Sequence, residues 1–260
     1  RQRQMCIRDS SQIGSETRER VLKLCDEMGY TTNFVARSMV TKRTNLIGLV
    51  VPSVDNQFMS ELAYHAEVSA RAHGYNIMLC DSGPDLKQEN TVVKLLLGRQ
   101  VDGILIVPQS SKSYDNLKSY LDQVPTVFLS ENLRSQPQSY VAVDNSRGTY
   151  LGTQYLYELG DQDILYFGQR PGSTTHQLRA DGYMKACHEF NLTPHFFNSE
   201  YSRSSIQGGY QLAKELFRKP LDCTAVFAAT DSNALGMLTA ADEMGIDIPG
   251  HLSLIGFDNL

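Results

Sequence analysis

Short apolar runs alternate with longer amphipathic stretches along the chain from residue 46 onward. The short runs are nearly continuous in apolar and β-branched residues, a pattern typical of strands that are buried on both faces. We therefore predict strands at Leu46–Val51, Asn76–Cys80, Gly103–Val107, Thr126–Leu129, Val141–Val143, Asp163–Phe167, Thr224–Ala228 and Leu252–Gly256.

Most stretches between these strands repeat apolar residues at the spacing of one helix face. Two such stripes are Met59, Leu62, Ala63, Ala66 and Ala70, and Leu151, Tyr155, Leu156 and Leu159. The second stripe ends at Gly160, a residue that favours helix ends. Further helices are predicted over 86–98, 112–121, 175–190, 204–218 and 232–244.

Strands that alternate with helices predict an α/β fold with parallel sheets. The strands are too many for one regular sheet, and a break over 131–145, with Pro137, divides them into two similar sets. We therefore predict two doubly wound parallel-sheet subdomains, at 45–144 and 145–260.

Two helices are predicted before the first strand. Ser15–Met28 carries Glu16 and Glu19 in its first turn, which suits the helix dipole, and ends at Gly29. Asn33 is placed to cap a second, short helix, Phe34–Val40.

The composition of the 260 residues describes a soluble, cytoplasmic protein. Hydrophobic residues make up 41% of the chain without a run of transmembrane length, so no membrane partner is expected, and no secretory signal is recognised. The five cysteines lie far apart, are odd in number and form no CxxC pair, which favours buried thiols in a reducing compartment.

Charge is distributed unevenly along the chain. The net charge is −5, but residues 1–43 hold nine Lys or Arg and five Asp or Glu, a local charge of +4. A basic N-terminal piece on an acidic body is compatible with a nucleic-acid partner, although many solvated termini look the same.

Polar side chains follow the predicted strands, where ligands bind in open parallel sheets. Carboxylates that accept hydroxyl hydrogens, with aromatic rings beside them, suit a hydroxyl-rich ligand such as a sugar, and Arg179 supplies further donors. The candidate effector site consists of Ser53, Asp55, Asn56, Phe58, Met59, Arg179, Tyr201, Asp231 and Asp258, of which Tyr201 is assigned only through the resemblance described below.

Each of these residues has a plainer interpretation. Asp231 is as well placed to cap the following helix as to bind a ligand. At least one of Phe58 and Met59 is expected to pack in the core, and Arg179 is more often a surface ion pair than a binding residue.

Motifs of common enzymes are missing from the sequence. It contains no GxSxG, GxxxxGK, GxGxxG or HExxH, and Cys187-His188 and Cys25 lack the spacing of metal ligands. We therefore expect a protein that is not an enzyme and that needs no cofactor and no metal.

Over roughly residues 11–260 the chain resembles the lactose-repressor (LacI-type) family of transcription regulators, through motifs that are weak alone and specific in their order and spacing. They are Glu16-Thr17-Arg18-Glu19-Arg20-Val21, Gly29-Tyr30, Asn33-Phe34-Val35-Ala36-Arg37-Ser38-Met39, Ile47-Gly48-Leu49-Val50-Val51-Pro52, Asn56-Gln57-Phe58, Val101-Asp102-Gly103-Ile104, Asp144-Asn145, Arg179-Ala180-Asp181-Gly182-Tyr183, Asp231-Ser232-Asn233-Ala234-Leu235-Gly236 and Ser253-Leu254-Ile255-Gly256-Phe257-Asp258-Asn259.

The resemblance implies a periplasmic-binding-protein-like core behind a DNA-binding hinge helix. Its hinge positions correspond to Asn33, Ala36, Arg37 and Met39, with Met39 in place of the leucine that wedges into the minor groove. It also implies effector contacts at Phe58, Met59, Arg179, Tyr201, Asp231 and Asp258. The segments 59–73 and 222–244 would form the face of a homodimer.

The chain departs from the family pattern at both ends. Residues 1–10 match nothing in the family and are interpreted as a foreign segment, and 11–44 as a headpiece remnant with the hinge helix. The last family segments are missing after Leu260, so the chain is expected to be truncated at both ends. Gln57 replaces the usual proline after Asn56.

The leading hypothesis is a cytoplasmic transcription regulator, a repressor, whose partners are operator DNA and a small effector. A sugar is the expected effector, and nucleobases are the known exception. The alternative is a sugar-binding protein of the periplasmic type without DNA binding, and an enzyme on the same architecture is a third class. The hinge-like segment favours the regulator.

Overall fold

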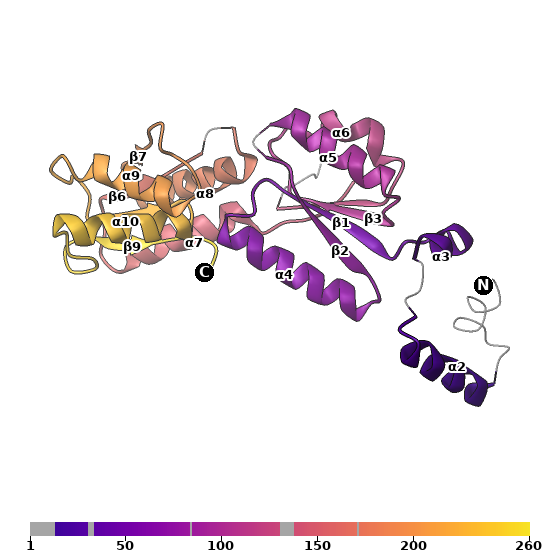
Figure 1. Cartoon of the computed structure of the whole chain (residues 1–260). Coiled ribbons are helices and arrows are strands. Elements are labelled where there is room, and N and C mark those ends of the chain that lie inside the picture. Colours follow the sequence, from indigo (N-terminus) through magenta and orange to yellow (C-terminus); the bar gives the residue numbers. More distant parts are fainter. Residues whose placement is uncertain (1–13, 31–33, 84, 131–137, 171) are drawn as a thin grey trace.

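The computed structural model describes residues 14–30, 34–83, 85–130, 138–170 and 172–260, with only the backbone for 34–37. These residues form two α/β subdomains, which lie next to each other along one axis, and an N-terminal arm beside the first of them (Figure 1). The predicted cap Asn33, residues 1–10 and Pro137 lie outside the described residues.

The N-terminal subdomain is built on a five-stranded parallel sheet in the order β2-β1-β3-β4-β5. Helix α4 packs on one face of this sheet, and α5 and α6 pack on the other (Figure 1). The elements are β1 (Leu46–Val51), α4 (Gln57–Ala72), β2 (Asn76–Asp81), α5 (Leu86–Gly98), β3 (Gly103–Ile106), α6 (Ser113–Leu121), β4 (Thr126–Leu129) and β5 (Ser139–Val141).

The C-terminal subdomain repeats this arrangement on a four-stranded parallel sheet in the order β7-β6-β8-β9. Helices α7 and α8 cover one face of the sheet, and α9 and α10 cover the other. The elements are α7 (Asn145–Glu158), β6 (Ile164–Phe167), α8 (Thr174–Phe190), β7 (His195–Phe197), α9 (Ile206–Leu216), β8 (Ala225–Ala228), α10 (Asp231–Met244) and β9 (Ser253–Ile255).

Two doubly wound parallel sheets confirm the predicted fold class, and the strand predictions fail only at the edges of the sheets. Strand β7, which was not predicted, has only three residues with alternating exposure and so lacks the signal of a buried strand. Strand β5 ends at Val141 and not at Val143, because this edge strand has a neighbour on one side only and both valines are exposed.

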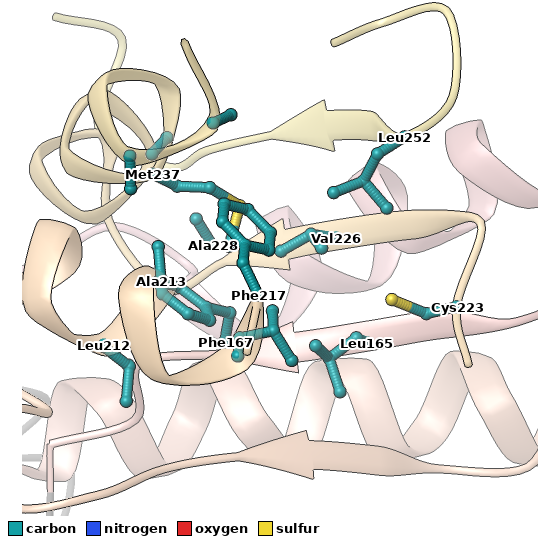
Figure 2. Packing of buried hydrophobic residues seen from close by; sticks show 14 residues of the cluster. Leu165, Phe167, Leu212, Ala213, Phe217, Cys223, Val226, Ala228, Met237 and Leu252 are labelled. Atoms are coloured by element: carbon teal, nitrogen blue, oxygen red, sulfur yellow. The ribbon is translucent and has the colours of Figure 1, made fainter. Parts of the chain in front are cut away.

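Continuous apolar strands supply the centre of each core. In the C-terminal subdomain Phe167 and Val226, from β6 and β8, pack against Leu212 of α9 and Met237 of α10 (Figure 2). Cys187 and Cys223 are buried as predicted, whereas Cys25 is only half-buried. Burial of these side chains from both faces of the sheets keeps the strand ends in fixed positions.

Two helices precede β1. Helix α2 (Ser15–Glu27) buries none of its residues, and α3 (Phe34–Thr41) lies beside the amino end of β1 (Figure 1). The predicted short helix therefore forms, one residue longer than expected.

Gly182 of α8 lies directly against the backbone of α7. A Cβ atom at this position would lie 2.1 Å from the backbone oxygen of Ser146. We expect Gly182→Ala to lower the free energy of unfolding by about 1–3 kcal/mol, measured by urea denaturation. Gly98→Ala is the matched control, because its Cβ meets nothing within 4 Å and alanine favours a helix by up to about 1 kcal/mol. Equal effects of the two changes would contradict this account of the contact.

Candidate effector-binding site

The two subdomains meet through the loops at the carboxyl ends of their strands. Asn56, at the start of α4, donates from Nδ2 to the backbone oxygen of Ser204 in the C-terminal subdomain at 3.0 Å. Thr175 of α8 donates from its hydroxyl to the backbone oxygen of Ser130, which follows β4, at 3.1 Å. Ligands of doubly wound sheets bind at these strand ends, so the region between the subdomains is the candidate site.

Arg179 of α8 is the buried charge at the centre of this region, with 5% of its surface exposed. Its Nη2 lies 2.9 Å from Oδ1 of Asp258, which follows β9. Nε donates to Oδ1 of Asn145 at the start of α7, and Nη1 donates to the backbone oxygen of Ala229 after β8. The guanidinium stacks on Phe257, with Cζ 3.8 Å from the ring centroid. One side chain therefore joins three elements of the C-terminal subdomain, and the interpretation of Arg179 as a surface ion pair is wrong.

Burial raises the pKa of Asp258 to about 6, although the charge of Arg179 and its hydrogen bond act in the opposite direction. The carboxylate has only 8% of its side chain exposed, so the cost of removing a charge from water outweighs the single ion pair. A ligand hydroxyl that donates to this carboxylate would therefore stabilise the ionised form.

His176 links the same loop system. Its Nδ1 accepts from the backbone amide of Arg170, and its Nε2 lies 2.8 Å from the hydroxyl of Ser204. Burial, followed by the charges of Arg179 and Arg170, lowers the pKa of His176 to about 3, so the ring is neutral and Nε2 donates its proton to Ser204. The chain from His176 through Ser204 to Asn56 connects the C-terminal subdomain to α4.

Asp231 is the first residue of α10, but it is not the cap of that helix. Thr230 accepts from the amide of Asn233 as the N-cap, and Asp231 accepts from the amide of Leu260. Tyr201 lies in an exposed turn with 37% of its surface accessible, and its backbone amide donates to the hydroxyl of Ser199. The role of both residues in effector binding stays a prediction.

The N-terminal subdomain presents its own residues at the end of β1. The hydroxyl of Ser53 donates to Asp55, and Asn56 caps α4 through the amide of Met59. Met59 packs on the core beside Leu49, whereas Phe58 is half-buried outside the core clusters. Met59 is therefore the one of the two residues that packs in the core, as expected for at least one of them. No hydrogen bond or ring contact described in this region joins Phe58 to Arg179 or Asp258.

Three residues of this region, Asn145, His176 and Ser204, were not identified as site residues from the sequence. Asn145 comes shortly after the predicted strand Val141–Val143, as part of Asp144-Asn145, and could have been found as another strand-end residue. His176 and Ser204 carry no signal in the sequence, because they are separated by 28 positions and are brought together only by folding.

A cavity of about 730 Å³ lies away from this region, at the amino ends of the strands in the N-terminal subdomain. It is bounded by the end of α3 and by the loops before β2, β3 and β4. Met39 of α3 lines it and is 79% exposed, and the helix also contains Ala36 and Arg37. Of the predicted hinge residues, Met39 and the backbone of Ala36 and Arg37 therefore lie at the edge of the sheet opposite to the strand ends that carry Asn56.

The described residues contain neither a metal-binding cluster nor a membrane-spanning helix. No cluster of three or more His, Cys, Asp or Glu side chains there could hold a metal ion. Among the same residues, no helix is both long enough and apolar enough to span a membrane.

Two parallel-sheet lobes that meet at their strand ends define a binding core of the periplasmic-binding type. The family model described as "periplasmic binding proteins and sugar binding domain of LacI family" matches residues 44–260. The chain therefore belongs to the LacI family.

Relatives and solved structures agree with this assignment. The chain is 31% identical over 257 residues to the HTH-type transcriptional regulator DegA of Bacillus subtilis (strain 168), which covers 97% of this chain and 76% of that protein. The lac repressor dimer bound to operator and the anti-inducer ONPF has the same fold, with a TM-score of 0.86, 23% identity, and coverage of 100% of this chain and 78% of that one. A LacI family regulator from Enterococcus faecium with bound ribose has a TM-score of 0.72 and 27% identity, with coverage of 82% and 78%.

The raised pKa of Asp258 predicts that its contribution to stability has the opposite sign to that of an ordinary carboxylate. Its pKa of about 6 in the folded protein exceeds the ordinary value of 3.8, so the folded state holds the extra proton between these values and the free energy of unfolding falls as pH rises. Relative to that of Asp258→Asn, the free energy of unfolding of the wild type should fall by about 2 kcal/mol between about pH 4.5 and pH 7.5, measured by urea unfolding. If wild type and Asp258→Asn differed in free energy of unfolding by the same amount at both pH values, the raised pKa of Asp258 would be excluded.

Proposed function

We propose that the protein is a DNA-binding transcription regulator, acting as a repressor, whose two-lobed core binds a small effector between its subdomains. Membership of the LacI family and the similarity to the regulator DegA support this proposal over a sugar-binding protein without DNA binding. The proposal of a regulator rests on one observation above all. Strand β1 directly follows the short helix α3 and ends at the loop that contains Asn56, so one strand connects the proposed hinge to the proposed effector site.

The proposed effector is a sugar. Asp258 offers a carboxylate to hydroxyl donors, Arg179 retains N–H groups beyond its three bonds, and Phe58 lies at the start of α4 on the facing subdomain. The related Enterococcus faecium regulator holds ribose. The remaining proposed contacts are Ser53, Asp55, Asn56, Met59, Tyr201 and Asp231.

The proposal assigns a role to each part of the chain. Residues 11–44 supply the headpiece remnant and the hinge helix, with DNA contacts from Asn33, Ala36, Arg37 and Met39, and 45–144 and 145–260 supply the two lobes of the core. Effector binding changes the angle between the lobes, and in a homodimer this changes the spacing of the hinge helices. The proposed regulator acts in the cytoplasm and is not an enzyme.

Selection and screening test this function together. The full-length protein should select a symmetric duplex from a random pool, and a thermal-shift screen of sugars and nucleobases should find a stabilising compound. Recovery of no preferred duplex would overturn the regulator, whereas stabilisation only by nucleobases would overturn the proposed class of effector.

Arg179→Ala is expected to weaken binding of the effector found in that screen. Loss of a charged hydrogen-bond donor should cost on the order of 1.5–3 kcal/mol of binding free energy, measured by calorimetry. Arg218→Ala removes an exposed arginine outside the site and serves as the control, and circular dichroism checks that both variants fold. Because Arg179 also supports the fold, Asp258→Asn provides a second variant with an intact guanidinium. Unchanged affinity in both site variants would reject the assignment.

The homodimer is expected to use the outer face of α4. Tyr64 and Val68 lie one helical turn apart and are 64% and 46% exposed, and Leu235 and Leu238 of α10 are exposed as well. Replacement of Tyr64 and Val68 by lysine should convert the dimer to a monomer in sedimentation velocity, because a symmetric interface places each new charge twice. Leu95→Lys, on α5 at the other face of the sheet, is the control. A wild type that sediments as a monomer would contradict this prediction.

A further inference from the structure

We propose that Asp102 is a positioning residue that fixes where the hinge helix leaves the effector-binding core. This inference rests on the proposed function, since it concerns how a change in the core reaches the DNA-binding arm. It assigns a specific role in that coupling to a carboxylate that lies at the amino end of β3, far from the effector residues.

Asp102 accepts three hydrogen bonds from the linker between α3 and β1. Oδ1 lies 2.9 Å from the amide nitrogen of Thr44 and 3.0 Å from its hydroxyl, and Oδ2 lies 3.0 Å from the amide nitrogen of Asn45. We call this arrangement the Asp102 clamp. A carboxylate that accepts two consecutive amides and a hydroxyl fixes both the position and the direction of the chain.

Further bonds hold the same two linker residues between β2 and β3. The hydroxyl of Thr44 shares its one hydrogen between Asp102 and the backbone oxygen of Gln100, which lies 2.9 Å away, and Asn45 donates from Nδ2 to the backbone oxygen of Gly74. The backbone oxygen of Asn45 accepts from the amide of Asn76. The linker is thus attached to the loops before both neighbours of β1, and the clamp is its only charged attachment among the hydrogen bonds described for Thr44 and Asn45.

The distance from the clamp to the hinge helix is short. Helix α3 ends at Thr41, so only Lys42 and Arg43 separate it from Thr44. Three Cα–Cα steps span at most about 11 Å, and therefore the end of the hinge helix stays within that distance of the clamp. Movement of β3 in the N-terminal subdomain is thereby transmitted to the start of the arm.

The role of the clamp can be separated from the effect of its charge by the direction of the change in DNA affinity. Asp102 is a negative charge beside the basic arm residues Lys42 and Arg43, all three of which border the cavity at this edge. If only charge mattered, Asp102→Asn would strengthen DNA binding, because one repulsion of the phosphates is removed. If the clamp positions the arm, the same change weakens binding, because the amide group of asparagine places a donor against the amide of Thr44 or Asn45.

The test combines hydrogen exchange of the free protein with DNA affinity. Asp102→Asn is compared with Asp122→Asn, which removes a charge from the exposed residue after α6 at the same edge and breaks no described bond to the linker. The probe is the duplex that the full-length protein selects from a random pool, measured by fluorescence anisotropy. Thr44→Val and the double variant with Asp102→Asn complete a mutant cycle.

We expect Asp102→Asn to abolish protection of the Thr44 and Asn45 amides and to weaken DNA binding about tenfold, with effector affinity unchanged. Asp122→Asn should leave protection intact and should not weaken binding, and Thr44→Val should add little to Asp102→Asn. Retained protection in Asp102→Asn, or lost protection with equal or stronger DNA binding, would overturn the proposal. If no duplex is selected, the regulator proposal fails, while hydrogen exchange still decides whether the clamp holds the linker.

Discussion

Parallel strands direct all their carboxyl ends to one edge of a sheet and all their amino ends to the other. Every described strand pair in this protein is parallel, so each subdomain has two edges with different surroundings. The carboxyl edges meet each other, where Asn56 bonds to Ser204. The amino edge of the N-terminal subdomain carries the linker and α3. Strand β1 is six residues long and joins these two edges, which makes it the shortest covalent path between the proposed effector site and the proposed hinge helix.

A buried positive charge organises the carboxyl edge of the C-terminal subdomain. Arg179 cannot remain uncompensated at 5% exposure, and its bonds to Asp258, Asn145 and Ala229 satisfy it from three elements. This arrangement fixes the strand ends relative to one another, so less conformational entropy would be lost on binding of the proposed effector. The ionisation of Asp258 remains costly, so a ligand hydroxyl that donates to its carboxylate would favour the ionised form and lower its pKa.

Predictions from the sequence succeeded where one local pattern decides the structure. Continuous apolar runs such as Leu46–Val51 identified the central strands, and the order of strand and helix identified the fold class. The pattern failed at β7, since three residues of an edge strand carry little periodicity. The site was predicted as a set of strand-end residues, but the burial of Arg179 and the roles of His176 and Ser204 depend on contacts between distant parts of the chain. No local pattern contains such contacts.

A thermodynamic cycle of DNA and effector binding measures the coupling between the two edges. DNA affinity of the full-length protein is determined with and without saturating effector, and effector affinity is determined with and without the selected duplex. A coupled protein must give the same factor in both directions, and we predict a factor of about 5 to 150. Affinities for both ligands that do not depend on each other would contradict the account, even if each ligand binds tightly.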